Sequence, residues 1–162
     1  IEIPGNLGAL VRTLDACGGD CLVLTNRRTR LSHPGVFRGS RGMVLRVPVV
    51  DLDQPHRAAA WLQERGFTVY LATPGAVAYP EVTFAQRSAV VVGNERYGIA
   101  APWFDLGLPQ IAVPMFGLAD SLNVSVSASI LLYAARAGAA GWLSPAAVPA
   151  AVPARVAGAG IG

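Results

Sequence analysis

Apolar positions along the first 137 residues follow two spacings that alternate. Between residues 6 and 16 they recur every three or four positions, which predicts a helix with one apolar face. Short apolar runs rich in β-branched residues predict strands. The predicted strands are residues 21–25, 44–50, 67–72, 89–92 and 110–113. The further predicted helices are residues 55–65, a short one around 102–104, and 121–137.

This alternation of strands and helices indicates an α/β domain with a mainly parallel sheet covered by helices on both faces. Residues 31–42 contain three glycines and a proline, so they predict a loop with at most a short helix. The domain is expected to cover residues 1–143. Residues 144–162 are rich in Ala, Pro, Val and Gly, and they predict a flexible tail.

Composition fits one compact soluble domain. The chain has 162 residues, of which 52% are hydrophobic and 14% charged, and this is enough apolar material for a substantial core. No apolar run reaches the roughly 20 residues of a membrane helix, and residues 1–5 do not resemble a signal peptide. Cys17 and Cys21 fit neither a disulfide framework nor a zinc site. We therefore expect reduced thiols, no metal and a cytoplasmic location.

The basic residues are unevenly distributed. All 13 of them are arginine, and six stand between Asp20 and Asp51 without an acidic residue among them: Arg27, Arg28, Arg30, Arg38, Arg41 and Arg46. Because guanidinium groups bind phosphate through a planar, bidentate fork, this cluster indicates a nucleic-acid surface. A solvated surface in a protein from a GC-rich genome explains the absence of lysine equally well, but it does not explain the clustering.

Three polar segments interrupt the apolar pattern. The first, residues 6–13, opens the first helix with Asn6 and places Arg12 six residues later. Taken alone, these two residues are typical of a helix cap and a surface charge. The second, residues 92–98, runs from an apolar strand into Gly-Asn-Glu-Arg-Tyr-Gly. Ligands bind where loops leave the carboxyl ends of parallel strands, so this strand end is a candidate site.

The second segment is neither a dinucleotide fingerprint nor a P-loop, because it lacks G-x-G-x-x-G and the chain contains no lysine. The third segment, residues 111–127, contains a strand that ends in proline, a glycine-containing loop and then Ser-Leu-Asn at a predicted helix start. Backbone donors and small polar side chains gather at such a helix start. Ser121 is also expected to be the N-cap of this helix.

In this order the three segments resemble the signature motifs of the SpoU (TrmH) family of RNA ribose 2'-O-methyltransferases, a branch of the SPOUT superfamily. The motifs are N-x-G-x-x-x-R, G-N-E-x-x-G and I/V-P-M-x-G-x-x-x-S-L-N-V-S, and they stand here at residues 6–12, 93–98 and 113–125. The likeness covers about residues 1–137. It implies S-adenosylmethionine-dependent methyl transfer to a ribose 2'-hydroxyl, and a deep trefoil knot in the C-terminal part of the sheet.

The resemblance also implies the site residues. The polar constellation is Asn6, Arg12, Glu95, Ser121 and Asn123. The cofactor, which leaves as S-adenosylhomocysteine, is expected against Ala72, Thr73, Pro74, Gly93, Asn94, Val113, Met115, Ser121, Leu122 and Asn123. RNA contacts are expected from Arg12, Arg27, Arg28, Arg38 and Arg41. Since arginine is effectively always protonated, Arg12 is expected to position or stabilise rather than to act as a general base.

Family members are typically homodimers, and they begin the domain with a strand before the asparagine of the first motif. Here only residues 1–5 precede it, so either that strand lies outside this chain or the sheet lacks an edge. Many relatives also carry an N-terminal RNA-recognition region, which is not present in these 162 residues.

Cues to the substrate conflict. Residues 37–42 and 47–50 resemble the thiopeptide-resistance enzymes that modify 23S rRNA, whereas residues 62–70 resemble the tRNA guanosine enzymes. We favour 23S rRNA slightly. The alternative is an RNA-binding module without catalysis on a knotted scaffold, and the intact polar residues argue against it. A knotted base methyltransferase from a neighbouring branch is disfavoured by the Ser-Leu-Asn segment.

Overall fold

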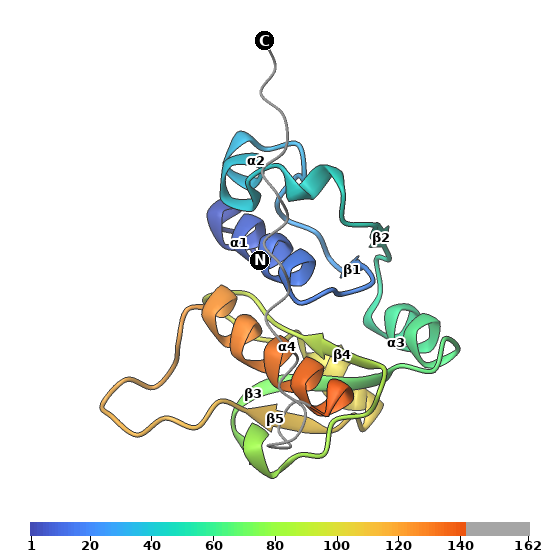
Figure 1. Cartoon of the computed structure of the whole chain (residues 1–162), viewed down its shortest axis with the longest axis vertical. Coiled ribbons are helices and arrows are strands. Elements are labelled where there is room, and N and C mark those ends of the chain that lie inside the picture. The colour runs from blue at the N-terminus through green and yellow to red at the C-terminus, as the bar shows by residue number, and fades with distance from the viewer. Residues whose placement is uncertain (142–162) are drawn as a thin grey trace.

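The computed structural model of this protein describes residues 1–141 (Figure 1). Its α-helices are α1 (Pro4–Ala16), α2 (Pro34–Ser40), α3 (Pro55–Gln63) and α4 (Val124–Ala140). Its strands are β1 (Leu22–Leu24), β2 (Val49–Asp51), β3 (Thr68–Ala78), β4 (Ser88–Val91) and β5 (Gln110–Ala112). Three 3-10 helices are η1 (Met43–Leu45), η2 (Tyr79–Glu81) and η3 (Ala101–Leu106). The predicted tail, residues 144–162, lies outside the described residues.

The strands form two parallel sheets. β1 pairs with β2, and β3 lies between β4 and β5 in a three-stranded sheet. In Figure 1 the two sheets lie one above the other, with β1 and β4 nearest the opposite sheet. The prediction of an α/β fold with parallel strands is confirmed, although the described residues form two sheets where one was expected.

The three-stranded sheet is covered on both faces, as predicted. Val69 and Leu71 of β3 pack with α3 and η3, while Tyr70 between them packs with Leu131 of α4. Successive side chains of a strand point to opposite faces, so β3 is buried from both sides. Figure 1 shows α4 crossing this sheet. Among residues 1–141, no helix is long and apolar enough to cross a membrane.

A separate cluster of buried apolar residues forms around helix α1. Its buried face carries the apolar residues that predicted it, Leu7, Leu10, Val11 and Leu14. Gly8 lies on the same face, and a Cβ at this position would lie 2.6 Å from the carbonyl oxygen of Val36 in α2. The glycine therefore allows α1 and α2 to pack backbone to backbone.

The predicted strand at residues 44–50 is wrong for most of its length. The chain instead forms η1 and then a strand of only three residues, β2. Gly42 has a φ of +82°, and the Met43 carbonyl accepts hydrogen bonds from the Arg46 and Val47 N–H groups, which closes a turn. Met43 and Val44 pack against the α1 core from this turn. Val47 is buried and Val44 is half-buried, and side-chain burial does not require an extended backbone.

Strand β3 is longer than the predicted residues 67–72, and it contains an irregularity. Both Ala72 and Val77 are in register with Ile111 of β5, so the residues between them bulge out of the ladder. Gly75 in this bulge has a φ of +77°, which glycine adopts without steric cost. Pairing with β5 is thus interrupted after Ala72, where the predicted strand ended, and it resumes beyond the bulge.

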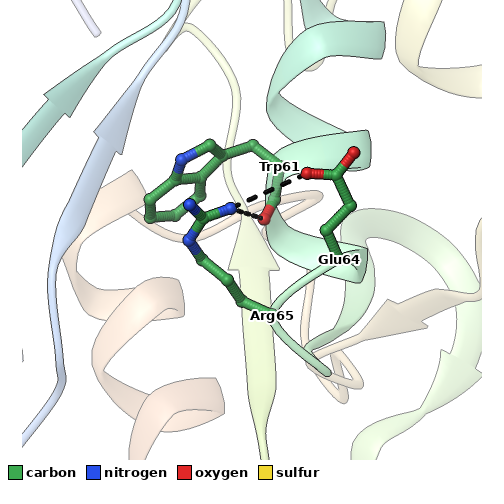
Figure 2. Close-up of polar contacts among 3 residues, drawn as sticks. All are labelled: Trp61, Glu64 and Arg65. Atoms are coloured by element: carbon green, nitrogen blue, oxygen red, sulfur yellow. Dashed lines mark hydrogen bonds and ion pairs between the residues drawn. The ribbon is translucent and has the colours of Figure 1, made fainter.

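Helix α3 ends at Gln63, two residues before the predicted boundary. Figure 2 shows why Arg65 still belongs to this helix end: its Nη1 donates to the Trp61 carbonyl oxygen over 3.0 Å. The guanidinium carbon lies 4.1 Å from the centre of the Trp61 ring, and Nη1 lies 3.8 Å from Glu64 Oε2. A cation at a helix C-terminus interacts favourably with the last carbonyl groups.

The two cysteines are free, as predicted, with Cys17 buried and Cys21 half-buried. Burial raises the pKa of both thiols above the ordinary value. Both side chains therefore stay protonated at neutral pH.

Candidate active site

Glu95 lies in the loop after β4 and binds the start of the chain. Its Oε2 accepts a hydrogen bond from the Glu2 N–H over 3.0 Å. Its Oε1 accepts from the Ile3 N–H over 3.3 Å and from Asn6 Nδ2 over 3.0 Å. These three donors engage both carboxylate oxygens, so the second motif holds the first motif in place.

The side chain of Asn6 continues this network to the third motif. Its Oδ1 accepts a hydrogen bond from Asn123 Nδ2 over 3.1 Å. Asn123 is the N-cap of α4: its Oδ1 accepts from the Ser125 N–H over 2.9 Å and from Ser125 Oγ over 2.7 Å. The chain Glu95–Asn6–Asn123 therefore joins all three sequence motifs through side-chain hydrogen bonds.

The environment of Glu95 favours its charged form. Partial burial raises the pKa of Glu95, but the hydrogen bonds from Glu2, Asn6 and Ile3 outweigh this effect and leave the pKa below its ordinary value. The carboxylate is therefore ionised at neutral pH. With both oxygens occupied, it holds other groups in position.

The loop that carries Glu95 is shaped by its own residues. Asn94 and Gly98 exchange backbone hydrogen bonds of 2.8 and 2.9 Å, and Asn94 Oδ1 accepts from the Arg96 N–H over 2.8 Å. A Cβ at Gly93 would collide with the backbone of Gly98 and Ile99. Gly98 itself has a φ of +68°. The two glycines of the G-N-E-x-x-G motif are thus needed for the fold of the loop.

Arg12 does not join this network in the described structure. It is exposed on α1, one and two-thirds helical turns beyond Asn6, or about 9 Å along the axis. It lines a shallow groove together with Gly39 of α2 and Tyr133 of α4. A hydrogen bond of 2.9 Å between Thr13 Oγ1 and Ser129 Oγ holds α1 against α4 beneath this groove.

Ser121 also stays outside the network. Its hydroxyl donates to Asp120 Oδ1 over 3.2 Å, and the side chain is exposed. The prediction that Ser121 caps the last helix is wrong, because α4 begins at Val124 and Asn123 supplies the cap. The preceding loop exposes Phe116 almost completely, at 96%.

The expected cofactor segments meet at one edge of the three-stranded sheet. Thr73 lies in the bulge of β3, Gly93 follows β4 and Val113 follows β5, and these three strands are parallel neighbours. Their carboxyl ends therefore lie at the same edge, where α/β proteins bind ligands. Thr73 Oγ1 is buried and has no hydrogen-bond partner among residues 1–141. A buried hydroxyl of this kind normally has a partner, so this edge fits a polar ligand.

Several residues that build the site carried no recognisable sequence signal. Glu2 and Ile3 take part through backbone N–H groups, which every residue but proline has. Thr29 Oγ1 donates to the carbonyl oxygens of Ile1 and Glu2 over 3.1 and 2.8 Å. Only the fold brings Thr29 to the N-terminus.

The expected RNA-binding arginines are all exposed, and one of them is paired. Arg27 Nε lies 3.0 Å from Asp51 Oδ2. Arg38 lies in the last turn of α2, and Arg41 follows that helix with a left-handed φ of +51°. Gly39, between them, borders the groove of Arg12. Arg12, Arg38 and Arg41 thus belong to the packed pair α1 and α2.

Comparison with known proteins identifies the family. The sequence matches the SpoU rRNA Methylase family over residues 1–133. The chain belongs to this family. It is 34% identical to the 23S rRNA (guanosine(2553)-2'-O)-methyltransferase RlmP of Bacillus subtilis (strain 168), over 134 residues that make up 82% of this chain and 54% of that protein.

Two further similarities concern Streptomyces viridochromogenes. A 23S rRNA (uridine(2479)-2'-O)-methyltransferase of this organism is 29% identical over 138 residues, which cover 82% of this chain and 48% of that protein. The crystal structure of its SpoU methyltransferase AviRb with AdoMet superposes with a TM-score of 0.75 at 27% identity, covering 82% of this chain and 52% of that one. The chain spans about half the length of these family members.

Proposed function

We propose that this chain is the catalytic part of an S-adenosylmethionine-dependent RNA ribose 2'-O-methyltransferase. The observation that carries this proposal is the hydrogen-bonded series Glu95–Asn6–Asn123, which ties the three family motifs together beside the carboxyl ends of the sheet. The family relatives named as rRNA 2'-O-methyltransferases, and the similar structure bound to AdoMet, support it.

The residues at the sheet edge fit S-adenosylmethionine. The Thr73 hydroxyl is a buried polar group available to the cofactor, and the loops after β4 and β5 supply backbone groups beside it. The predicted cofactor residues of these segments, such as Gly93, Val113 and Leu122, would line the same edge. We include in the proposal that the chain between β3 and α4 forms the trefoil knot of the family.

When bound, S-adenosylmethionine supplies a methyl group activated by its sulfonium sulfur. The protein must then hold the ribose hydroxyl in line with that methyl group. Asn6 can do so, because its Nδ2 uses one hydrogen on Glu95 and keeps the second free, while its Oδ1 is oriented by Asn123. Glu95 acts as a positioning residue, since its oxygens are occupied by the chain itself.

Arg12 serves as a hydrogen-bond donor in this proposal. A guanidinium group stays protonated, so it stabilises the negative charge that develops on the ribose oxygen or binds the adjoining phosphate. Arg12 and Asn6 lie apart on the same helix α1, so Arg12 of a second copy of the chain would complete the constellation around Asn6. We propose a homodimer for this reason. The half-exposed side chains of Val126 and Tyr133 on α4 support such a contact.

The proposed substrate is structured RNA, with 23S rRNA favoured over tRNA. Arg28, Arg38 and Arg41 are exposed and would bind its phosphates, whereas Arg27 is already paired with Asp51. The names of the relatives from Bacillus subtilis and Streptomyces viridochromogenes favour rRNA.

Calorimetric titration with S-adenosylhomocysteine tests the proposal. The chain is expected to bind this product, and Thr73→Val is expected to weaken binding about tenfold, the value of one hydrogen bond. Because the Thr73 hydroxyl has no protein partner among the described residues, the same variant is expected to unfold at an unchanged or higher temperature. Absence of binding to the folded chain would contradict the proposal, and retained RNA binding would then favour the non-catalytic alternative.

A further inference from the structure

Two consecutive peptide groups at the start of the chain are bound at both of their polar edges. In the first, the Ile1 carbonyl oxygen accepts a hydrogen bond from Thr29 Oγ1 over 3.1 Å, and the Glu2 N–H donates to Glu95 Oε2 over 3.0 Å. In the second, the Glu2 carbonyl oxygen accepts from Thr29 Oγ1 over 2.8 Å, and the Ile3 N–H donates to Glu95 Oε1 over 3.3 Å. Thr29 and Glu95 therefore bind opposite edges of the same two peptide groups.

This arrangement links the Thr29 hydroxyl to the Glu95 carboxylate. A trans peptide group is planar, with its N–H and C=O pointing in opposite directions, and residues 1–141 contain no cis peptide bond. Turning either peptide group away from Thr29 therefore turns its N–H away from Glu95. A hydrogen bond to the carbonyl oxygen also polarises the peptide group, which makes its N–H a stronger donor. Loss of the Thr29 hydroxyl would thus weaken two of the hydrogen bonds that Glu95 accepts.

Thr29 is the buried residue of an otherwise exposed basic loop. The chain turns after β1 at Asn26, which has a left-handed φ of +46°. Arg28 and Arg30 on either side of Thr29 are exposed, whereas only 7% of Thr29 itself is exposed. A buried hydroxyl takes a hydrogen-bond partner, and both acceptors of Thr29 belong to the N-terminal segment. The loop therefore presents arginines to solvent and a hydroxyl to residues 1–2.

The segment that Thr29 holds leads directly into the first motif. The Ile3 carbonyl oxygen accepts hydrogen bonds from the Asn6 and Leu7 N–H groups over 3.0 and 3.2 Å, where α1 begins. The side chain of Asn6 donates to Glu95 Oε1, the oxygen that also accepts from the Ile3 N–H. Both the backbone and the side chain of Asn6 therefore depend on the position of Ile3.

We infer that Thr29 is a positioning residue of the candidate active site, which acts on Asn6 through the two N-terminal peptide groups and Glu95. This role rests on the proposed function, in which Asn6 orients the ribose hydroxyl. Thr29 does not contact the reacting atoms, because its one hydroxyl hydrogen is shared between two carbonyl oxygens. Through Thr29, the loop that would contact RNA phosphates at Arg28 is joined to the amide that orients the ribose.

The first test measures the pKa of Glu95, which does not depend on methyl transfer. Thr29→Val keeps the shape of the side chain and removes its hydroxyl. Hydrogen bonds to a carboxylate lower its pKa, so this variant is expected to raise the pKa of Glu95 toward the ordinary glutamate value, about 4.3. Thr29→Ser keeps the hydroxyl and is expected to keep the pKa of the parent. Carbon-13 NMR titration of the Glu95 carboxyl group measures all three chains.

Thr25→Val is the matched control for the first test. It makes the same chemical change at a half-buried position four residues earlier, and it leaves the contacts of Thr29 intact. The pKa of Glu95 is expected to be the same in this control as in the parent. An unchanged pKa of Glu95 in folded Thr29→Val would overturn the inference. If Thr29→Val does not fold, Thr29→Ala is measured in its place.

The second test measures methyl transfer from S-adenosylmethionine to 23S rRNA transcribed in vitro. Thr29→Val is expected to lower kcat about tenfold, the value of one hydrogen bond, and to change the KM for RNA less than twofold. Thr29→Ser is expected to retain the kcat of the parent. In a Glu95→Gln background, Thr29→Val is expected to lower kcat no further, because Thr29 acts through that carboxylate.

The outcomes of the second test separate the two proposals. A raised KM with an unchanged kcat in Thr29→Val would overturn the inference, because Thr29 would then contribute to RNA binding alone. Equal losses of kcat in the parent and Glu95→Gln backgrounds would overturn it as well. An inactive parent chain would contradict the proposed function, and the pKa of Glu95 would still decide whether Thr29 positions the carboxylate.

Discussion

Asn6 and Asn123 are 117 positions apart in the sequence, yet Asn123 Nδ2 donates to Asn6 Oδ1 over 3.1 Å. The same Asn6 side chain donates to Glu95, so one amide links two segments that are far apart in the sequence. An amide is suited to this position because it accepts through its oxygen and donates through its nitrogen. This double contact gives the first prediction.

Asn6→Asp is expected to destabilise the chain by about 1 to 3 kcal/mol, because it replaces the donor to Glu95 with a second carboxylate. The free energy of unfolding in urea measures this loss. Gln63→Glu makes the same chemical change at an exposed position of α3 and is expected to have little effect. Equal stability of the two variants would show that the Asn6–Glu95 contact contributes nothing.

Stability at acidic pH is expected to depend on Glu95. Its folded pKa is lowered, so the stabilisation is fully present above the unfolded carboxyl pKa, about 4.3, and is lost as pH falls through the folded value. Glu95→Gln removes this dependence, and its unfolding free energy should fall less steeply below that pH than that of the parent. Glu64→Gln removes a carboxylate whose ion pair with Arg65 is exposed, and it is the control for the loss of one negative charge.

Much of this site followed from the sequence, because its motifs place small polar residues where apolar strands end. Asn6, Glu95 and Asn123 were chosen on that basis, and the structure brings these three together. Sequence reasoning did not find Thr29, because a threonine after a short strand has no distinguishing neighbour. Its role arises only when the fold brings it to the N-terminus.

The helices and strands, like the site residues, were predicted from the sequence only in part. Periodicity predicted α1 and α4 because an amphipathic helix repeats its apolar positions whatever it packs against. The strand predicted at residues 44–50 was mostly wrong because β-branched side chains fit any half-buried surface. The turn that forms there depends on Gly42, which has a positive φ, and on Ser40, whose Oγ accepts a hydrogen bond from the Val44 N–H. The predicted boundary at Ser121 failed because two cap residues, Ser121 and Asn123, stand close together in sequence.

The two candidate caps of α4 give a direct comparison. Asn123→Ala removes the N-cap and the contact to Asn6, and it is expected to cost about 1 kcal/mol or more. Ser121→Ala removes only an exposed contact to Asp120 and is expected to stay within about 0.5 kcal/mol of the parent. Thermal unfolding followed by circular dichroism measures both. A larger loss in the Ser121 variant would mean that α4 begins earlier in solution.

Glycine substitutions are expected to act in opposite directions at two positions. Gly93→Ala places a Cβ against the backbone of Gly98 and should destabilise the chain by about 3 kcal/mol. Gly5→Ala, within α1, meets no atom within 4 Å and should stabilise it by about 0.5 to 1 kcal/mol through helix propensity. Urea unfolding of the two variants checks both signs, and a neutral Gly93→Ala would refute the close approach of that loop.

The arginines around α2 are expected to bind RNA through charge alone. Arg28→Ala combined with Arg38→Ala should weaken binding of an rRNA fragment and reduce the slope of log affinity against log salt by about 0.7 to 0.9 for each phosphate that the protein no longer neutralises. Arg57→Ala on α3 removes one positive charge from an exposed helix away from α2, and its effect per charge removed is the control for net charge. Fluorescence anisotropy at several salt concentrations measures the RNA affinity of each variant and its dependence on salt. If the slope falls equally per charge removed in the two variants, general positive charge explains binding and the α2 surface is not the RNA site.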